Sequence, residues 1–95
     1  MLTGKVAIIT GARQGIGEAV AVAFARAGAD LTLVSRKIAE EDEVVAKCRE
    51  AGRRVLVMQV DVADRKQVEK MVERTLETFG KVDILFNNAG VSRPA

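Results

Sequence analysis

Apolar residues gather in four short runs along the chain, and within each run they are nearly continuous instead of alternating with polar residues. Such runs are typical of strands that are buried on both faces, as in a parallel sheet. The sequence therefore predicts four buried strands, at Lys5–Thr10, Asp30–Ser35, Arg54–Val60 and Val82–Asn87.

Stretches with helical spacing separate these runs. In the first stretch, apolar residues recur at intervals of three and four, which predicts one buried helix face that Gly28 ends. This face would comprise Ile16, Ala19, Val20, Ala23, Phe24 and Ala27. The second stretch is more polar and predicts a helix from about Ile38 to Ala51, stopped by Gly52. Its inner contacts would be Ile38, Val44, Val45 and Cys48.

The third stretch predicts the clearest helix. Asp64 is placed to cap it, and Gln67, three residues later, could reach back to the cap amide. Gly80 would end the helix. Its predicted buried face comprises Val68, Met71, Val72, Thr75, Leu76 and Phe79.

The predicted order is thus β-α-β-α-β-α-β, which implies parallel pairing through right-handed crossovers. We expect an α/β fold with a partial Rossmann-type, doubly wound sheet of strand order 3-2-1-4. Two helices would cover one face and the third only part of the other. Inward residues drawn from Val6, Ile8, Ile9 and Leu85 would then be under-covered, and the fourth strand would form an open edge. Open apolar edges pair with other chains. We therefore expect the isolated chain to self-associate, through Val82–Asn87 or the bare sheet face, or to be only marginally folded.

Composition narrows the function classes. With 95 residues the chain is one domain at most, and its net charge of +2 comes from basic residues interleaved with acidic ones. Mixed signs without neighbouring aromatic residues argue against nucleic-acid binding. No apolar run is long enough for a membrane span. One cysteine and no histidine leave neither an internal disulfide nor a His/Cys metal site, and a reducing, cytoplasmic setting is expected.

Glycines stand where the first strand turns into the first helix. Gly11, Gly15 and Gly17 would allow a tight turn, close approach of backbone to pyrophosphate, and helix–strand packing. The amides of the helix N-terminus would face the phosphates. The segment also contains Arg13, Gln14 and Ile16. The alternative is an ordinary connecting loop. A P-loop is excluded because no Gly-Lys-[Ser/Thr] follows.

The end of the second strand bears on which dinucleotide is bound. NAD-binding units place a carboxylate there for the ribose 2′-hydroxyl, whereas this chain has Ser35-Arg36-Lys37 and carries Asp30 at the other end of the strand. A guanidinium beside a hydroxyl can hold a 2′-phosphate, and Arg13 could approach the same group. We therefore predict NADP, with NAD as the alternative. Arg36 and Lys37 could otherwise be a solvated loop pair.

Three motifs together resemble the short-chain dehydrogenase/reductase family. These are Thr10-Gly11-x3-Gly15-x-Gly17, Asp61-Val62 after the third run, and Asn87-Asn88-Ala89-Gly90 after the fourth. The resemblance covers essentially residues 1–95, and is greatest to 3-oxoacyl-acyl-carrier-protein reductases and sugar or polyol dehydrogenases. It implies hydride transfer between alcohols and carbonyls, with Asp61-Val62 at the adenine and Asn88-Ala89-Gly90 beside the cofactor ribose. Taken alone, Asp61 could cap a turn toward Asp64, and Asn87-Asn88 could be a polar turn.

No catalytic residue is assigned. The family's catalytic Ser and its Tyr-x-x-x-Lys motif come later than Asn-Asn-Ala-Gly, this chain contains no Tyr, and Ser92 follows the motif too closely. The chain alone is therefore expected to be inactive, as the front portion of a longer reductase. The alternatives are a self-standing dinucleotide-binding module and a structural protein that retains the fold without its ligand.

Overall fold

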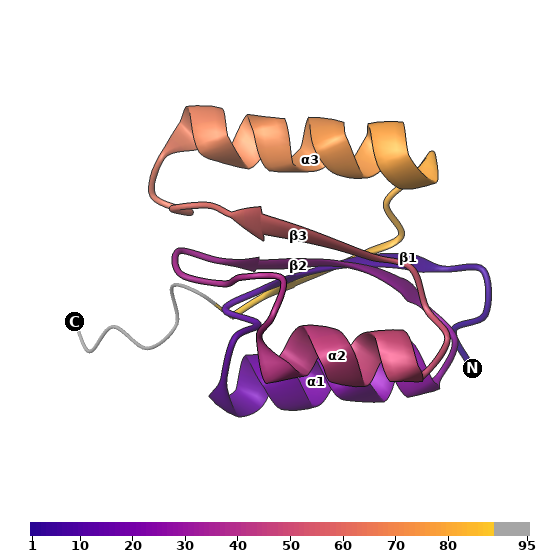
Figure 1. Cartoon of the computed structure of the whole chain (residues 1–95). Coiled ribbons are helices and arrows are strands. Elements are labelled where there is room, and N and C mark those ends of the chain that lie inside the picture. Colours follow the sequence, from indigo (N-terminus) through magenta and orange to yellow (C-terminus); the bar gives the residue numbers. More distant parts are fainter. Residues whose placement is uncertain (89–95) are drawn as a thin grey trace.

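A parallel sheet with helices on both faces forms the body of the protein (Figure 1). The computed structural model describes residues 1–88. The elements are β1 (Val6–Thr10), α1 (Gly15–Arg26), β2 (Asp30–Ser35), α2 (Glu43–Glu50), β3 (Val55–Gln59), α3 (Arg65–Phe79) and β4 (Ile84–Asn87). No helix within residues 1–88 is long and apolar enough to cross a membrane.

The strand order is β3-β2-β1-β4, which confirms the predicted 3-2-1-4 topology. All three neighbouring pairs are parallel, and Ile8 of β1 lies in register with Thr32 of β2 and Leu85 of β4. Because parallel strands point the same way, the loops that follow β1, β2, β3 and β4 all leave from one edge of the sheet. This carboxyl edge is where ligands bind in open α/β sheets.

The two faces of the sheet are covered unequally. Helices α1 and α2 lie together on one face and α3 lies alone on the other (Figure 1). The larger core cluster lies between the sheet and the helix pair, and includes Ile9, Leu31, Leu33, Val44 and Val45. The smaller cluster under α3 contains Ile8, Val34, Val60 and Met71. The pair of helices on one face and the single helix on the other match the expectation from the sequence.

The buried face of α1 differs from the predicted stripe. The buried residues are Gly17, Ala21 and Ala25, while Ile16 is 68% exposed and Ala19 and Ala23 are also exposed. A row of small residues lets the helix approach the sheet closely. Val20 and Phe24 of the predicted stripe are still half-buried against the larger core cluster, so the buried face is rotated from the predicted one and partly overlaps it.

Helix α2 begins at Glu43, five residues later than predicted. Asp42 accepts a hydrogen bond at Oδ2 from the amide of Ala39 at 2.9 Å, and its own amide donates to the Ala39 carbonyl at 3.1 Å. This local turn competes with helix for residues 39–42. Ile38 is nonetheless buried, and its carbonyl accepts a hydrogen bond from the Gln59 side chain.

Helix α3 keeps its predicted ends but buries a narrower face. Asp64 caps it and Gly80 ends it in the left-handed conformation. Gln67 reaches back to the cap residue as predicted, but to its side chain and not its amide: Nε2 donates to Oδ2 of Asp64 at 3.0 Å. Its Oε1 accepts from the amide of Asp61 at 2.8 Å, and the Asp64 amide donates to the Asp61 carbonyl. Val72 and Leu76, predicted to be buried, are 37% and 45% exposed. A helix packed alone on a sheet contacts it through one stripe only.

Coverage of the sheet is also better than predicted on the central strand. Val6, Ile8 and Ile9 are at most 2% exposed, so their predicted under-coverage is wrong. Ile8 packs in the cluster under α3, and Ile9 belongs to the core beneath the helix pair. Of the residues predicted to be under-covered, only Leu85 of the edge strand β4 is exposed, at 57%.

Candidate functional site

Three glycines where β1 turns into α1 meet two different structural needs. Gly11 and Gly15 have φ values of 64° and 63°, in the left-handed region that side chains disfavour. A Cβ at Gly17 would overlap the carbonyl oxygen of Gly11. The turn and the close helix–loop packing therefore both require glycine, while the space beside Gly15 is open.

The N-terminus of α1 offers unshared backbone donors. Gln14 occupies the N-cap position with φ −156° and makes no side-chain cap hydrogen bond. The first amides of a helix have no acceptor within the helix, and together with its dipole they attract an anion. Ile16, whose amide is among them, is exposed. This arrangement fits the pyrophosphate predicted from the sequence.

A backbone hydrogen bond holds the glycine loop against the end of β2. The amide of Ala12, which is fully buried, donates to the carbonyl of Val34 at 3.0 Å. This bond fixes Ala12 next to Val34, and so it brings the next residues along the chain, Arg13 and Ser35, to neighbouring positions. The glycine loop, which carries Arg13, and the segment after β2, which carries Arg36, therefore leave the sheet side by side.

The two predicted phosphate-binding arginines differ in their surroundings. Arg36 is exposed and, within residues 1–88, forms no hydrogen bond or ion pair. Ser35 Oγ accepts a hydrogen bond from the Lys37 amide at 3.3 Å. Arg13 donates from Nε to Oδ2 of Asp42 at 3.2 Å. Asp42 was not predicted as a site residue, because the sequence pattern placed it inside the helix expected from Ile38 to Ala51.

An open cleft of about 200 Å³ lies where the glycine loop approaches the start of α2. It is lined by Arg13, Gln14, Glu18, Asp42 and Glu43. Glu18 forms an ion pair with Lys47 of α2 at 3.4 Å. Polar side chains of opposite charge thus face each other beside the glycine loop.

Asp61, at the carboxyl end of β3, forms the turn that leads into α3. Its Oδ1 accepts from the amide of Ala63, and its carbonyl accepts from the amide of Asp64, both at 2.9 Å. Asp61 therefore caps the turn toward Asp64 that the sequence indicated as its alternative role. Val62 is half-buried against the cluster under α3.

The carboxyl ends of β1 and β4 are joined through Thr10. Its hydroxyl donates to Oδ1 of Asn87 at 2.8 Å and accepts from the amide of Asn88 at 2.9 Å. Thr10 is buried, and its bridging role was not evident from the sequence pattern. Asn88 is thereby held at the same sheet edge as the glycine loop. Ala89 and Gly90, also predicted at the cofactor, lie outside the described residues.

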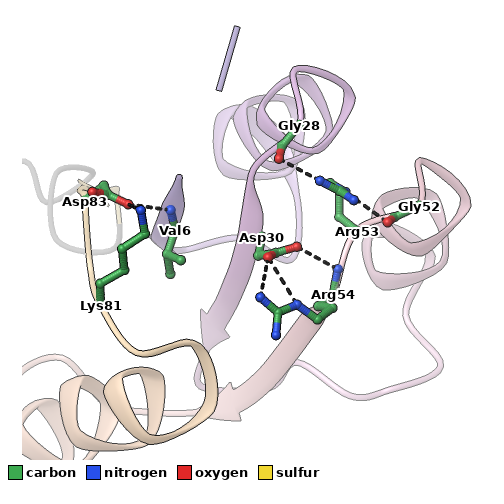
Figure 2. A network of polar contacts seen from close by, with 8 residues as sticks. All are labelled: Val6, Gly28, Asp30, Gly52, Arg53, Arg54, Lys81 and Asp83. Carbon is green, nitrogen blue, oxygen red and sulfur yellow. Dashed lines mark hydrogen bonds and ion pairs between the residues drawn. The ribbon is translucent and has the colours of Figure 1, made fainter. Parts of the chain in front are cut away.

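Charged side chains at the amino ends of the strands, opposite the carboxyl edge, stabilise the fold. Figure 2 shows Asp30 bound to Arg54, which contacts it through the backbone amide at 3.0 Å and through the guanidinium at 2.7 Å. Asp83 Oδ2 accepts from the amide of Val6 and from Lys81 (Figure 2). Asp30 thus lies at the start of β2, at the other end of the strand from Ser35, as the sequence predicts.

Both carboxylates are stabilised in the charged form. Burial raises the pKa of Asp30, but hydrogen bonds and charge from Arg54 and the charge of Arg53 outweigh it and hold that pKa below its usual value. The hydrogen bond from Val6, followed by contacts with Lys81, lowers the pKa of Asp83 despite some desolvation. Neither group is poised to exchange protons near neutral pH.

Cys48 of α2 is unsuited to nucleophilic chemistry. It is fully buried in the larger core cluster. Burial, with a further contribution from the charge of Glu18, raises the pKa of its thiol to about 11. Because the thiolate is the reactive form, Cys48 acts as a core residue.

Comparison with known proteins gives one consistent family. The family model described as short chain dehydrogenase matches residues 5–95. The oxidoreductase UcpA of Salmonella typhimurium is 50% identical over 93 residues, which are 97% of this chain and 35% of that protein. The 2-dehydro-3-deoxy-D-gluconate 5-dehydrogenase of Dickeya dadantii is 45% identical over 97% of this chain and 36% of its own length. The chain thus spans about a third of the curated relatives that it matches.

Solved structures agree with the fold. A putative short-chain dehydrogenase/reductase from Burkholderia xenovorans superposes with a TM-score of 0.88 at 40% identity, covering 99% of this chain and 38% of that one. A short chain dehydrogenase from Mycobacterium paratuberculosis, crystallised bound to NAD, gives 0.85 at 34% identity and covers 98% of this chain and 39% of that one.

Proposed function

Because the chain belongs to the short-chain dehydrogenase family, we propose that it supplies the cofactor-binding portion of an oxidoreductase that interconverts alcohols and carbonyl compounds. The nicotinamide of the bound cofactor supplies or accepts the hydride. The residues of this chain bind and orient the cofactor: Gly11, Gln14, Gly15, Ile16 and Gly17 hold the pyrophosphate through the loop backbone and the α1 N-terminus. Binding of a dinucleotide, NAD or NADP, is common to the family.

NADP is the proposed cofactor, and the observation that carries this choice is the exposed Arg36 without a partner among residues 1–88. Ser35 and Arg36 would hold the 2′-phosphate, with Arg13 contributing from the glycine loop. The carboxylate that an NAD-binding unit would need is absent from the end of β2, and Asp30 is bound to Arg54 at the opposite edge. NAD remains the alternative.

The remaining contacts are assigned to the carboxyl edge of the sheet. We propose that Asp61 and Val62 border the adenine, with Asp61 also keeping its turn. Asn88, Ala89 and Gly90 would pass beside the ribose. The hydrogen bond that the Asn88 amide donates to the Thr10 hydroxyl supports this assignment, since it holds that segment next to the glycine loop.

Calorimetry with two small ligands tests the cofactor choice. Adenosine 2′,5′-bisphosphate should bind more tightly than AMP by about 1–3 kcal/mol, as expected for one charge-assisted contact. Arg36→Asp should reverse this preference. Arg65→Asp makes the same charge change at an exposed arginine of α3 and serves as the matched control, with the preference unchanged. Equal affinities in the wild type, or tighter AMP binding, would remove the NADP assignment.

We also propose that this chain is inactive alone, because no residue in it is assigned as proton donor to a carbonyl. The rival is a self-standing dinucleotide-binding module. The bases after codon 95 distinguish the two: an open frame that encodes Tyr-x-x-x-Lys favours the longer enzyme. Hydride transfer by the 95-residue chain, followed by NADPH absorbance with carbonyl substrates, would contradict the proposed inactivity.

Self-association of the isolated chain is a further part of the proposal. β4 is an edge strand, and Leu85, Leu76 and Val72 expose apolar surface. Such edges pair with a second copy or leave the fold marginal. Sedimentation should show dimers or larger species, and a stable, well-folded monomer at high concentration would contradict this.

We further propose a cytoplasmic location, in keeping with the reduced thiol of Cys48.

A further inference from the structure

Asp42, the residue before α2, uses its carboxylate differently from the residue before α3. Both residues are aspartates at N-cap positions with extended backbone. Asp64 accepts hydrogen bonds from the amides of Lys66 and Gln67 in its own helix, as N-cap aspartates usually do. Asp42 makes no such bond to α2. Its Oδ2 accepts instead from the amide of Ala39 and from Nε of Arg13.

This carboxylate connects the two segments that carry the proposed phosphate-binding cations. Arg13 belongs to the glycine loop, and Ala39 lies three residues after Arg36 in the connection from β2 to α2. The Asp42 side chain is 21% exposed and that of Arg13 44%, so the carboxylate is the more enclosed partner. Both residues line the cleft beside the glycine loop.

The bond to Asp42 leaves the other end of the Arg13 guanidinium available. Arg13 donates from Nε, and within residues 1–88 neither terminal nitrogen forms a hydrogen bond. A guanidinium bound on one side to a carboxylate retains donors for a second anion. Fixing the side chain in advance also reduces the entropy lost when that anion binds.

We propose that Asp42 is a positioning residue that raises selectivity for a 2′-phosphorylated nucleotide by holding Arg13 ready for the phosphate. This inference rests on the proposed binding of NADP at the glycine loop. Asp42 does not contact the nucleotide and acts through Arg13, while its bond to Ala39 steadies the segment that follows Arg36.

The charge of Asp42 acts in the opposite direction. A carboxylate near a phosphate repels it, so a purely electrostatic effect would make removal of the charge strengthen phosphate binding. Loss of positioning lowers the affinity ratio on removal of the carboxylate, whereas loss of repulsion raises it. Salt screens the repulsion and also weakens the partly exposed Arg13–Asp42 ion pair, so the two effects are separated by their opposite signs.

Calorimetry on Asp42→Asn tests the proposal. The ratio of affinities for adenosine 2′,5′-bisphosphate and AMP should fall about threefold to tenfold, the effect of one side chain losing its order before binding. Arg13→Gln should lower the ratio as well, and adding Asp42→Asn to it should have no further effect. Asp64→Asn, which alters the other N-cap aspartate, should leave the ratio unchanged.

Failure of this inference differs from failure of the proposed function. A wild-type chain without preference for the bisphosphate overturns both. A wild-type preference that Asp42→Asn leaves unchanged or increases overturns the role of Asp42 alone. A readout without ligand gives a second test: the Nε–H proton of Arg13 should exchange slowly with solvent in the wild type and fast in Asp42→Asn. Equal exchange would also reject the proposal.

Discussion

The hydroxyls of Thr32 and Thr75 lie 2.8 Å apart and join the centre of the sheet to α3. Both side chains are fully buried. Thr75 Oγ1 donates its single proton to the carbonyl of Met71 at 2.8 Å, so the proton between the two threonines belongs to Thr32. A polar contact therefore fixes the position of the only helix on this face among residues 1–88.

This donor assignment predicts unequal effects of two valine substitutions. Thr75→Val leaves the Thr32 hydroxyl buried without an acceptor and should lower the free energy of unfolding by about 1–3 kcal/mol. Thr32→Val leaves Thr75 bonded to Met71 and should cost less, about 0.5–1.5 kcal/mol. Urea denaturation of both variants and of the double variant checks this, and the double variant should cost less than the sum. Equal single effects that add would reject the assigned direction.

Gly17→Ala tests the contact between α1 and the glycine loop. Helix propensity alone predicts a gain of about 1 kcal/mol in the free energy of unfolding. The added Cβ would overlap the Gly11 carbonyl oxygen, and we expect a net loss of about 1–3 kcal/mol, typical of overpacking. Thermal or urea unfolding gives the sign, and increased stability would show that the loop does not pack against Gly17.

Asp30→Asn should make the free energy of unfolding vary less with pH in the acid range. Because the folded-state pKa of Asp30 lies below its unfolded value of about 3.8, its ion pair stabilises the fold above that pH and loses this effect as pH falls through the folded-state pKa. At neutral pH the variant should lose about 1 kcal/mol or less, since Arg54 is largely exposed. The difference should vanish below the folded-state pKa. Urea titrations at several pH values measure it.

Glu69→Gln is the matched control for Asp30→Asn. It breaks the exposed ion pair of Glu69 with Arg65 on α3 and should leave stability nearly unchanged at every pH. A loss in Asp30→Asn that persists unchanged at low pH would mean that the carboxylate stabilises through packing and not through its charge.

Cys48 should resist thiol reagents in the folded chain. Its thiol is buried and its pKa is about 11, so almost no accessible thiolate exists at mildly alkaline pH. Labelling should be slow in buffer and complete in urea, with a rate in buffer that reports opening of the core. Rapid labelling in buffer would show that α2 does not stay packed on the sheet.

The strands and their order follow from the sequence because continuous apolar runs separated by amphipathic stretches admit few topologies. Local competition was harder to predict: Asp42 binds Ala39 and Arg13, so α2 starts late. Helix faces also shifted, because the close approach of Gly17 to the loop determines the rotation of α1. The pattern of large apolar residues does not contain that information.

The candidate site was predictable as far as its backbone was concerned. Glycines with left-handed φ values stand where the spacing placed them, at Gly11 and Gly15. Pairings between side chains distant in sequence were not predicted, because no local pattern encodes them. Arg13 meets Asp42 across 29 residues, and Thr10 meets Asn87 across 77.

Amide-resolved NMR titration of the 95-residue chain with NADP tests the central claim most directly. We expect the signals of the glycine loop, of the α1 N-terminus and of Ser35–Arg36 to shift together and to saturate with one binding constant. The amides at the opposite edge of the sheet, beside Asp30, Arg54 and Asp83, should not shift. Saturating shifts confined to that opposite edge, or no shifts at the glycine loop at high NADP concentration, would contradict the account.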